Sequence, residues 1–491
     1  MFTQYTFEDW QDAPEDKRET IDKVIKAYKA SEPFRAALSA IEYFNARNEG
    51  IKNKFLIKLD AYESRDEETG AVKMHRSEHK VEGNRVVSDF FYRFVIQQNH
   101  HLLGNGAVLD EGVKEKLGFG FDTTLSRMGE KALVTGCCWG FWNNGRLEMI
   151  ESCKDGLTGA VALVGETDSV PRVLIQFWQL SAEKPLRVRV IDETQVITYK
   201  ADKEGKLQLQ SQQSHKQIVV RDSMGTIAQT GSNYGVLPVF PLKANDEMAT
   251  ELRPSVKSKI DAFDRITSDF CDNLEMANEV IWVLNNFGGD RKDILSTIAQ
   301  IHELRTVVNI SDGTGSGSTA EQQTFEVPHA ARQTALEILR KELYRDAMAM
   351  DTDALPGTSL SSEAIETAAK ELNLKCDRFE WQVFDFMQKL LALIGMKTEN
   401  ISFKRQNIIN QTQTIENIYA AREDLDRRTR LQMNPTVPDD KIDGIMEAKS
   451  AEEASGLSDT DELQREMEKE LKRLGGQSRS EDQSPDGPAG A

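Results

Sequence analysis

Few residues of this chain have the types and spacing that catalysis or metal binding requires. His75 and His79 stand four residues apart, a spacing that would place two imidazoles on one face of a helix. Their surroundings, residues 60–82, are polar and predict a loop, so we expect a hydrated pair rather than a zinc site. Three acids that are close in sequence could bind a divalent cation: Asp346, Asp351 and Asp353. Acids in such a loop are more often simply hydrated, and we predict no metal site.

The chain also has no motif for nucleotide binding or nucleophilic catalysis. The Gly-rich run DGTGSGS, residues 312–318, could cradle a phosphate, but it lacks the GK[ST] ending and the helix start that should follow. No GxSxG, Walker A or Rossmann fingerprint is present. We therefore expect a protein that is not an enzyme and has no cofactor. One alternative stays open: a hydrolase whose carboxylates are scattered in the sequence and come together only in the folded protein.

Length and composition describe a soluble protein of several domains. A chain of 491 residues exceeds one ordinary core and should form two to four domains. It has 39% hydrophobic and 29% charged residues, and no stretch approaches the ~20 apolar residues that cross a bilayer. The first twenty residues are acidic and mixed, unlike a signal or transit peptide. We expect no membrane association and a location in the cytoplasm where the chain is made.

The net charge limits the partners that we expect, and the cysteines indicate whether disulfides or a zinc site are expected. The net charge is −19 and the isoelectric point is near 5.0, without the basic footprint of a protein that grips DNA. Either nucleic acid is no partner, or DNA must pass without adhering. Five cysteines without a CxxC pair argue against a disulfide framework or a zinc site, so we expect small buried core residues.

Two long predicted helices bracket a small irregular segment. The first covers residues 254–284 with Pro254 near its start, and the second covers residues 327–350, directly before the acidic loop DTDALPGTS. The segment between them is too short to bury its own core, so we expect neighbours to stabilise it. Two long helices on either side of such a segment, with a loop at the far end, indicate an element that serves as a lining rather than one that forms a pocket.

Acidic residues occupy the faces of the first long helix that its apolar residues leave free: Asp261, Asp264, Asp269, Asp272, Glu275 and Glu279. Two interpretations stay open. In the first, the acids form an ordinary solvated face; in the second, they line a channel or the rim of a contact between subunits.

The rest of the chain predicts a mixture of helices and antiparallel strands. Helical spacing dominates residues 1–60, and an aromatic helix covers residues 88–103. Strand-like runs with a hairpin signal at Asn144-Gly145 predict a β-rich module over residues 133–240. A third long helix, residues 364–395, carries an apolar stripe: Phe379, Val383, Phe386, Leu390 and Ile394. For the neighbouring Trp381 a packing role is expected.

The order of these parts resembles the stem, clip and tunnel loop of tailed-bacteriophage portal proteins of the SPP1 type. A second resemblance lies in the N-terminal half, where YFNARNEGI (residues 43–51) precedes GNRVVSDFFYRFVIQQNHHLLGNG (residues 83–106). Family members place a short Tyr-initiated motif before an aromatic helix that ends in Leu-Leu-Gly. Many relatives have Pro where this chain has Gly106. The likeness extends over about residues 43–449, and the order and spacing of several motifs carry it.

The resemblance implies an α+β fold, mainly a helical portal fold with long stem helices, a β-rich wing module and a small α/β clip. The implied parts are a wing (1–253, with its β-rich module at 133–240), a stem helix (254–284), the clip (285–326), a stem helix (327–349), the tunnel loop (350–361), a wing helix (362–396), the crown (397–475) and a disordered tail (476–491). The tunnel-loop residues expected to project into a channel are Met350, Asp351, Thr352, Asp353, Ala354, Leu355, Pro356 and Gly357.

In function, the resemblance implies a ring of about twelve subunits at one capsid vertex, through which DNA is packaged and ejected. The expected partners are double-stranded DNA bound nonspecifically, the terminase motor, head-completion or adaptor proteins, and the scaffolding and major capsid proteins. The expected location is the virion, after assembly in the host cytoplasm. Because the chain has no P-loop, the ATP-driven motor must be another protein. A non-viral oligomeric scaffold is the remaining alternative.

Three basic residues near the tunnel loop could touch passing DNA: Arg340, Lys341 and Arg345. In an acidic channel they would offer brief contacts to phosphates. The alternative is ordinary pairing with acids one helical turn away.

Overall fold

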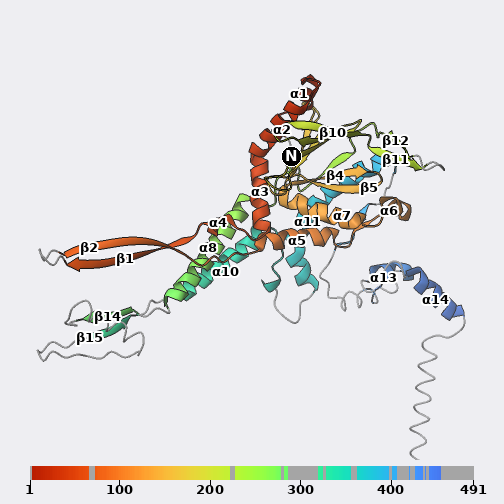
Figure 1. Cartoon of the computed structure of the whole chain (residues 1–491). Helices are drawn as coiled ribbons and strands as arrows, with labels where there is room; N and C mark the ends of the chain where they lie inside the picture. Colours follow the sequence, from red (N-terminus) through yellow and green to blue (C-terminus); the bar gives the residue numbers. More distant parts are fainter. Residues whose placement is uncertain are drawn as a thin grey trace, which may run out of the picture. The chain divides into compact units, whose positions relative to one another are not determined.

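The computed structural model (Figure 1) combines helices with antiparallel sheets, as expected for an α+β fold. It describes residues 3–65, 72–221, 227–277, 281–285, 319–323, 328–354, 362–396, 401–405, 418, 420, 426–434, 437 and 442–454. The chain divides into two compact units. One contains Met1–Ala354 and Ala368–Asn407, and the other contains Leu355–Thr367 and Ile408–Ala491.

The first unit begins with short helices, as the sequence predicts. They are α1 (Phe7–Asp12), α2 (Arg18–Ala30), α3 (Glu32–Phe44) and α4 (Glu49–Lys52). Each of α1 and α3 has a hydroxyl N-cap: the side chain of Thr6 accepts from Asp9 N, and that of Ser31 accepts from Phe34 N. The caps satisfy amides that the first turn would otherwise leave without a partner.

The expected loop at residues 60–82 is wrong. The structure has an antiparallel hairpin there, β1 (Phe55–Arg65) paired with β2 (Val72–Glu82), and both His75 and His79 lie on β2. The sequence alternates apolar and polar residues from Ile57 to Ala61, which is a strand pattern. The polar composition of the following residues obscured this pattern.

Two sheets form the predicted β-rich module. A five-stranded meander has the order β10-β9-β8-β7-β6, and a three-stranded sheet has the order β13-β4-β5. Asn144 and Gly145 both have positive φ, 46° and 79°, so the β4–β5 turn is the predicted type I′ hairpin. The strands are β4 (Cys137–Asn143), β5 (Arg146–Glu151), β6 (Gly159–Val164), β7 (Pro171–Trp178), β8 (Arg187–Ile191), β9 (Val196–Ala201), β10 (Leu207–Gln213) and β13 (Val239–Lys243).

Longer helices pack with these sheets and with one another. The predicted aromatic helix is α5 (Phe90–Leu103), and α11 (Ser362–Leu393) carries the predicted apolar stripe, of which Phe379, Val383, Phe386 and Leu390 are at most 1% exposed. The expected packing of Trp381 is wrong, because this side chain is 71% exposed on α11. The remaining helices of this core are α6 (Glu111–Leu117) and α7 (Phe121–Thr135).

The two predicted stem helices are α8 (Pro254–Ala277) and α10 (His329–Asp346), which lie side by side (Figure 1). The first is shorter than predicted. It ends at Ala277, and Ile281–Asn285 form β14, which pairs with β15 (Thr319–Gln323). Ile, Trp and Val favour strands, and a tertiary pairing prevails here over the helical spacing that included Ile281. Most of the expected clip lies outside the described residues.

Smaller elements complete the description. Two further strand pairs are β11 (Lys216–Arg221) with β12 (Ile227–Ser232), and β3 (Ala107–Val108) with β16 (Ser402–Phe403). In the second unit, α13 (Arg427–Met433) ends directly before Asn434, and α14 (Ile442–Ala454) follows. Arg428 pairs with Asp443 at 3.0 Å and joins these two helices. The expected tail lies outside the described residues.

Gly140 permits the close approach of β4 to α11. A Cβ atom built at Gly140 would lie 2.7 Å from the ring of Phe386 and 2.9 Å from Met128 Cε. We predict that Gly140→Ala lowers the free energy of unfolding by about 1–3 kcal/mol through overpacking. Tryptophan fluorescence during urea unfolding would measure this change, because Trp139 and Trp142 lie on the same strand.

Gly112→Ala is the matched control, because nothing lies within 4 Å of a Cβ at that position in α6. We expect this control to be neutral or slightly stabilising. Equal effects of the two substitutions would show that the contact with Phe386 does not limit the packing.

Candidate functional site

The candidate site consists of α8, α10 and the first residues of the loop after α10. An aromatic cluster joins both helices to α5. The Phe90 ring lies 5.0 Å from Phe263 of α8, and the Phe94 ring lies 5.3 Å from Tyr344 of α10, both edge to face. Such pairs add about 0.5–1.5 kcal/mol each beyond the apolar area that they bury. The pair of helices α8 and α10 is therefore anchored to the aromatic helix that the sequence pattern identified.

Ion pairs fix α10 along α8. Lys259 Nζ lies 2.7 Å from Asp346 and 3.0 Å from Glu342, and these hydrogen bonds raise the pKa of Lys259. Nearer the other end, Arg332 donates to the backbone carbonyl of Asp269 at 3.2 Å. These contacts are spaced along the helices and set the register of one helix against the other.

The acidic side chains of α8 do not form one solvent-exposed face, because two of them are buried. Asp264 and Asp272 are 1% and 4% exposed, and Ser268 between them is fully buried. Asn84 N donates to Asp272 Oδ1 at 2.7 Å, Val86 N donates to Ser268 Oγ at 3.0 Å, and Ser88 N donates to Asp264 Oδ1 at 3.0 Å. We call these three contacts the carboxylate ladder.

The ladder depends on two matching repeats. Four residues of helix rise about 6 Å, and two residues of extended chain advance about 6.6–6.8 Å. Positions 264, 268 and 272 of α8 can therefore meet positions 88, 86 and 84 in antiparallel order. A segment without regular secondary structure thus obtains backbone partners that a sheet would otherwise supply.

Side chains from the region of the N-terminal helices also bind the acids of α8. Asn48 donates to Asp264 Oδ2 at 2.5 Å, and Lys54 lies 2.5 Å from Asp272 and 2.8 Å from Asp269. Tyr43 donates to Asp261, and burial together with that carboxylate raises the pKa of Tyr43. Of the acids considered in the sequence, Glu275 is exposed, and Glu279 lies outside the described residues.

The net pKa shift has opposite directions at the two ladder acids. It raises the pKa of Asp264, although Ser88 and Asn48 donate to the carboxylate. Burial alone would also raise the pKa of Asp272, but the bonds from Lys54 and Asn84 together lower it below the ordinary value. Ionised Asp272 therefore stabilises the fold above its unfolded-state pKa, and this contribution is lost as the pH falls through the folded-state pKa.

The loop base is held by α5 and α11. Gln97 of α5 donates to Met350 O and accepts from Met350 N, both at 3.0 Å, and Met350 is 3% exposed. Lys375 of α11 donates at 3.0 Å to Ala347 O, where α10 ends. Residues 344–349 close the helix with the two bonds of a Schellman motif, with Met348 at φ 51°. Met350 is thus part of the packed base rather than a projecting residue.

Arg340 forms ion pairs with two acids in the described part of the loop after α10. Its guanidinium lies 2.7 Å from Asp351 and also bonds Asp353, and these contacts raise its pKa. Thr352–Ala354 form a 3-10 turn. The partners of Arg340 are loop acids, not the acids one helical turn away that the sequence suggested. Leu355, Pro356 and Gly357 lie outside the described residues.

The other two basic candidates share an exposed face of α10. Lys341 is exposed, and Arg345 keeps 68% of its side chain accessible, 4.0 Å from Glu342. Ile338 and Thr334 continue the same face one and two turns before Lys341. The structure thus separates the three candidates: Arg340 is engaged with the loop, whereas Lys341 and Arg345 face outward. Contact of any of them with DNA stays a prediction.

The cysteines, which remain to be considered for chemistry, lie mostly in the packed interior. Four cysteines, Cys137, Cys138, Cys153 and Cys376, are buried as free thiols. Burial raises the pKa of Cys153 and that of Cys376 to about 12. Within the described ranges, no three His, Cys, Asp or Glu side chains gather in a way that could hold a metal ion. Of the helices in those ranges, none is both long and apolar enough to cross a membrane.

Comparison with known proteins places the chain in a family. The model of the family described as "Phage portal protein, SPP1 Gp6-like" matches residues 37–470. The chain belongs to this family. The match includes α8, α10, the loop base and both resembling segments of the N-terminal half, so the predicted family is confirmed.

Two portal proteins are among the curated relatives. The portal protein of Clostridium phage phiCD119 is 27% identical over 174 residues, which are 35% of this chain and 38% of that protein. The portal protein of Bacillus phage SPP1 is 26% identical over 222 residues, 42% of each chain. The chain therefore aligns with about two fifths of the length of these relatives.

Sequence reasoning missed the residues that hold the site together. Asn48, Asn84 and Gln97 lie in the segments that carry the family resemblance, but neither they nor Lys54 and Lys375 were given a role, because their partners are distant in sequence. One signal was available. Small polar residues at positions 264, 268 and 272 recur every four residues, which places them on one helical face.

The ladder makes a direct prediction at Asp272. We expect Asp272→Asn to lower the free energy of unfolding at neutral pH by about 1.5–3 kcal/mol, because Lys54 loses a charged, buried partner. The difference from wild type should begin to shrink as the pH falls below about 4, where the carboxyl of the unfolded chain takes up its proton, and should be lost once the pH falls through the lower folded-state pKa of Asp272. Urea unfolding at several pH values measures both effects.

Glu275→Gln on the same helix is the matched control, because Glu275 is exposed. Its effect should stay within about 0.5 kcal/mol. A constant difference between Asp272→Asn and wild type down to acidic pH would contradict the assigned role of the carboxylate.

Proposed function

We propose that this protein forms a ring at one capsid vertex and that DNA passes through its centre during packaging and ejection. The observation that carries the proposal is the family match over residues 37–470, which contains the stem pair and the loop base. Portal proteins from two phages share part of this sequence. A ring of about twelve subunits, built from head-to-tail contacts that close, agrees with the expected architecture.

In this proposal α8 and α10 form the channel wall, and the loop after Met350 projects toward the DNA. Gln97 and Lys375 hold the loop base, and Arg340 ties Asp351 and Asp353 to α10. The loop would then start from a fixed position in every subunit. The exposed face with Lys341 and Arg345 provides positive charge for brief contacts with phosphates. Because Asp264 and Asp272 are buried within the chain, they take no part in repelling DNA.

The partners follow from the same proposal. The clip side of the ring would dock the terminase motor and later the head-completion or adaptor proteins, while scaffolding and major capsid proteins would surround the ring. The protein would be a virion component without enzymatic activity, and its location would be the capsid vertex after assembly in the host cytoplasm. The family match argues against a non-viral scaffold. A hydrolase is disfavoured because the acids at the loop base, Asp346, Asp351 and Asp353, are paired with cations of the same chain.

The double substitution Lys341→Glu/Arg345→Glu tests the role of the exposed face. We expect particles assembled with this variant to contain several-fold less DNA, because the face changes from attracting to repelling phosphates. Complementation of a phage that lacks its own functional portal, followed by DNA quantification per particle, measures this. Electron microscopy of the purified variant reports whether rings still form.

Lys200→Glu/Lys203→Glu is the matched control, since both lysines are exposed at the β9–β10 turn and the change in net charge is identical. Normal DNA content in the Lys341/Arg345 variant would remove this face from the mechanism. Loss of rings would instead place the face at a contact between subunits.

A further inference from the structure

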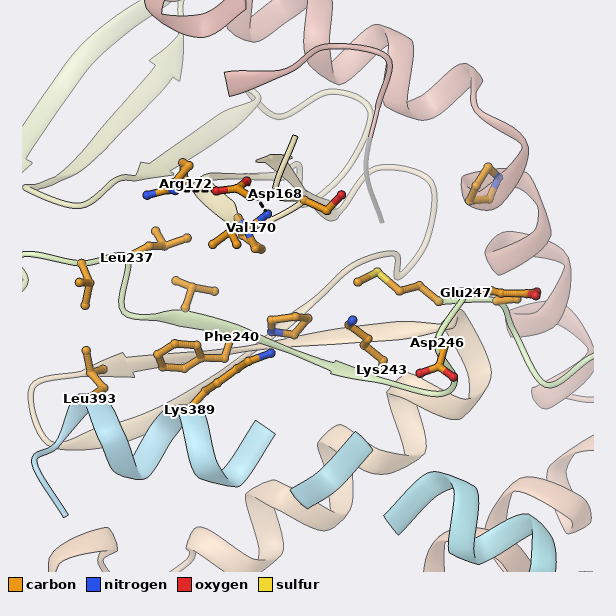
Figure 2. Close-up of a pocket in the computed structure, with 18 of the residues that line it drawn as sticks. Asp168, Val170, Arg172, Leu237, Phe240, Lys243, Asp246, Glu247, Lys389 and Leu393 are labelled. Carbon is orange, nitrogen blue, oxygen red and sulfur yellow. Dashed lines mark hydrogen bonds and ion pairs between the residues drawn. The ribbon is translucent and has the colours of Figure 1, made fainter. Parts of the chain in front are cut away.

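A large cleft lies in the first unit, away from the stem helices. It has a volume of about 1290 Å³, larger than the ~300–1,000 Å³ typical of small-molecule sites. Figure 2 shows its walls: the β6–β7 turn with Asp168 and Arg172, strand β13 with Phe240 and Lys243, and the end of α11 with Leu393. The N-terminal end of α3 completes the lining. A cleft of this size fits a segment of polypeptide.

The cleft runs along an open strand edge. β13 is an outer strand of the three-stranded sheet. Trp142 N donates to Pro238 O and Ala244 N donates to Gly136 O, so the even-numbered residues of β13 bond to β4. The N–H of Lys243 and the carbonyls of Pro241 and Lys243 consequently point away from β4. Pro241, which has no N–H to donate, is tolerated at such an edge.

Residues from both faces of β13 line the cleft, including Phe240 and Pro241. The cavity therefore lies along the edge of the strand rather than on one face of its sheet. An extended peptide in this position would continue the sheet by hydrogen bonding to the outward groups of β13.

The two ends of the cleft differ in chemistry. Leu237, Phe240 and Leu393 gather at one end, and Asp246 and Glu247 lie at the other (Figure 2). The first end can bury apolar side chains. The second end presents carboxylates on an exposed turn.

The charges of the lining favour a basic occupant. Five acidic and three basic residues line the cleft: Glu32, Asp168, Glu193, Asp246, Glu247, Arg172, Lys243 and Lys389. Arg172 is paired with Asp168 at 2.7 Å and with Glu193 at 3.4 Å, and Lys389 is paired with Asp385 at 2.6 Å. Asp246 accepts from Gln382 at 2.7 Å, and neither Glu247 nor Lys243 has an ion-pair partner among the residues that the structure describes. The lining therefore keeps an excess of acids at the Asp246 and Glu247 end, which favours a lysine or arginine of a partner.

We propose that this cleft binds an extended segment of a partner protein that adds a strand to β13. The segment places apolar side chains at the Leu237 end and a lysine or arginine beside Asp246 and Glu247. Backbone pairing supplies affinity, and the two ends of the cleft supply direction and specificity. The inference is independent of the proposed function, because it uses neither the stem helices nor the tunnel loop.

A selection from a random nonapeptide library displayed on yeast, against the full-length protein, tests the proposal. We expect enriched peptides with alternating apolar residues and a basic residue at one end. In the variant Asp246→Lys/Glu247→Lys the preferred charge at that end should become acidic. Enrichment of the same peptides by both proteins would overturn the assigned charge recognition, and enrichment of sequences found in this chain would assign the cleft to a second copy.

Filling the cleft tests the location. Ala392 of α11 lines the cleft and is exposed, so Ala392→Trp should weaken binding of an enriched peptide about tenfold or more. Ala448→Trp, on an exposed position of α14 in the second unit, is the matched control and should bind normally. Equal binding by both variants would overturn the proposal.

Amide hydrogen exchange tests the strand pairing itself. The Lys243 amide points to the open edge and should exchange at least several-fold more slowly when the peptide is bound. The Leu242 amide already bonds to β4 and should change little. A bound peptide that leaves Lys243 exchange unchanged would contradict strand addition even if Ala392→Trp abolishes binding.

Discussion

The carboxylate ladder is the constraint on which the arrangement of the stem depends. Asp264, Ser268 and Asp272 of α8 satisfy alternate backbone amides of residues 84–88, which have no sheet or helix of their own. A buried amide without a partner costs about 1–3 kcal/mol, so polar side chains are favoured at these three positions, where the bonds are partly buried. The ladder ties the first stem helix to the segment that leads into α5. Polar contacts between parts distant in sequence thus fix a helix that could otherwise slide on its apolar side.

From this anchor the remaining geometry follows step by step. The aromatic cluster joins α5 to both stem helices, and Lys259 sets α10 against α8. Gln97, in the middle of α5, then holds Met350, and Arg340 binds the acids that follow. The loop base is positioned by rigid elements on three sides. If every subunit of a ring repeats this arrangement, all loops begin at the same height in the channel.

Local patterns in the sequence predicted the elements, whereas long-range partners decided the site. Apolar spacing identified α5 and α11, and Asn144-Gly145 identified a hairpin, because these signals reside in neighbouring residues. The end of α8 at Ala277 and the hairpin at residues 55–82 were not predicted, since strand pairing there overrides local preference. The acids of α8 were identified, but their burial depends on residues 84–88, more than 170 positions away. Arg340 was selected for its charge, and its loop partners became visible only in the fold.

The most direct test of the central claim is electron microscopy of the purified protein combined with mass determination by light scattering. The account predicts rings with a central hole and a mass of about twelve times the 55.3 kDa chain, with α8 and α10 on the channel wall at higher resolution. A particle that stays a single 55.3 kDa chain at every concentration, even when made together with its capsid proteins, would contradict it. So would a ring whose channel is lined by elements other than these two helices.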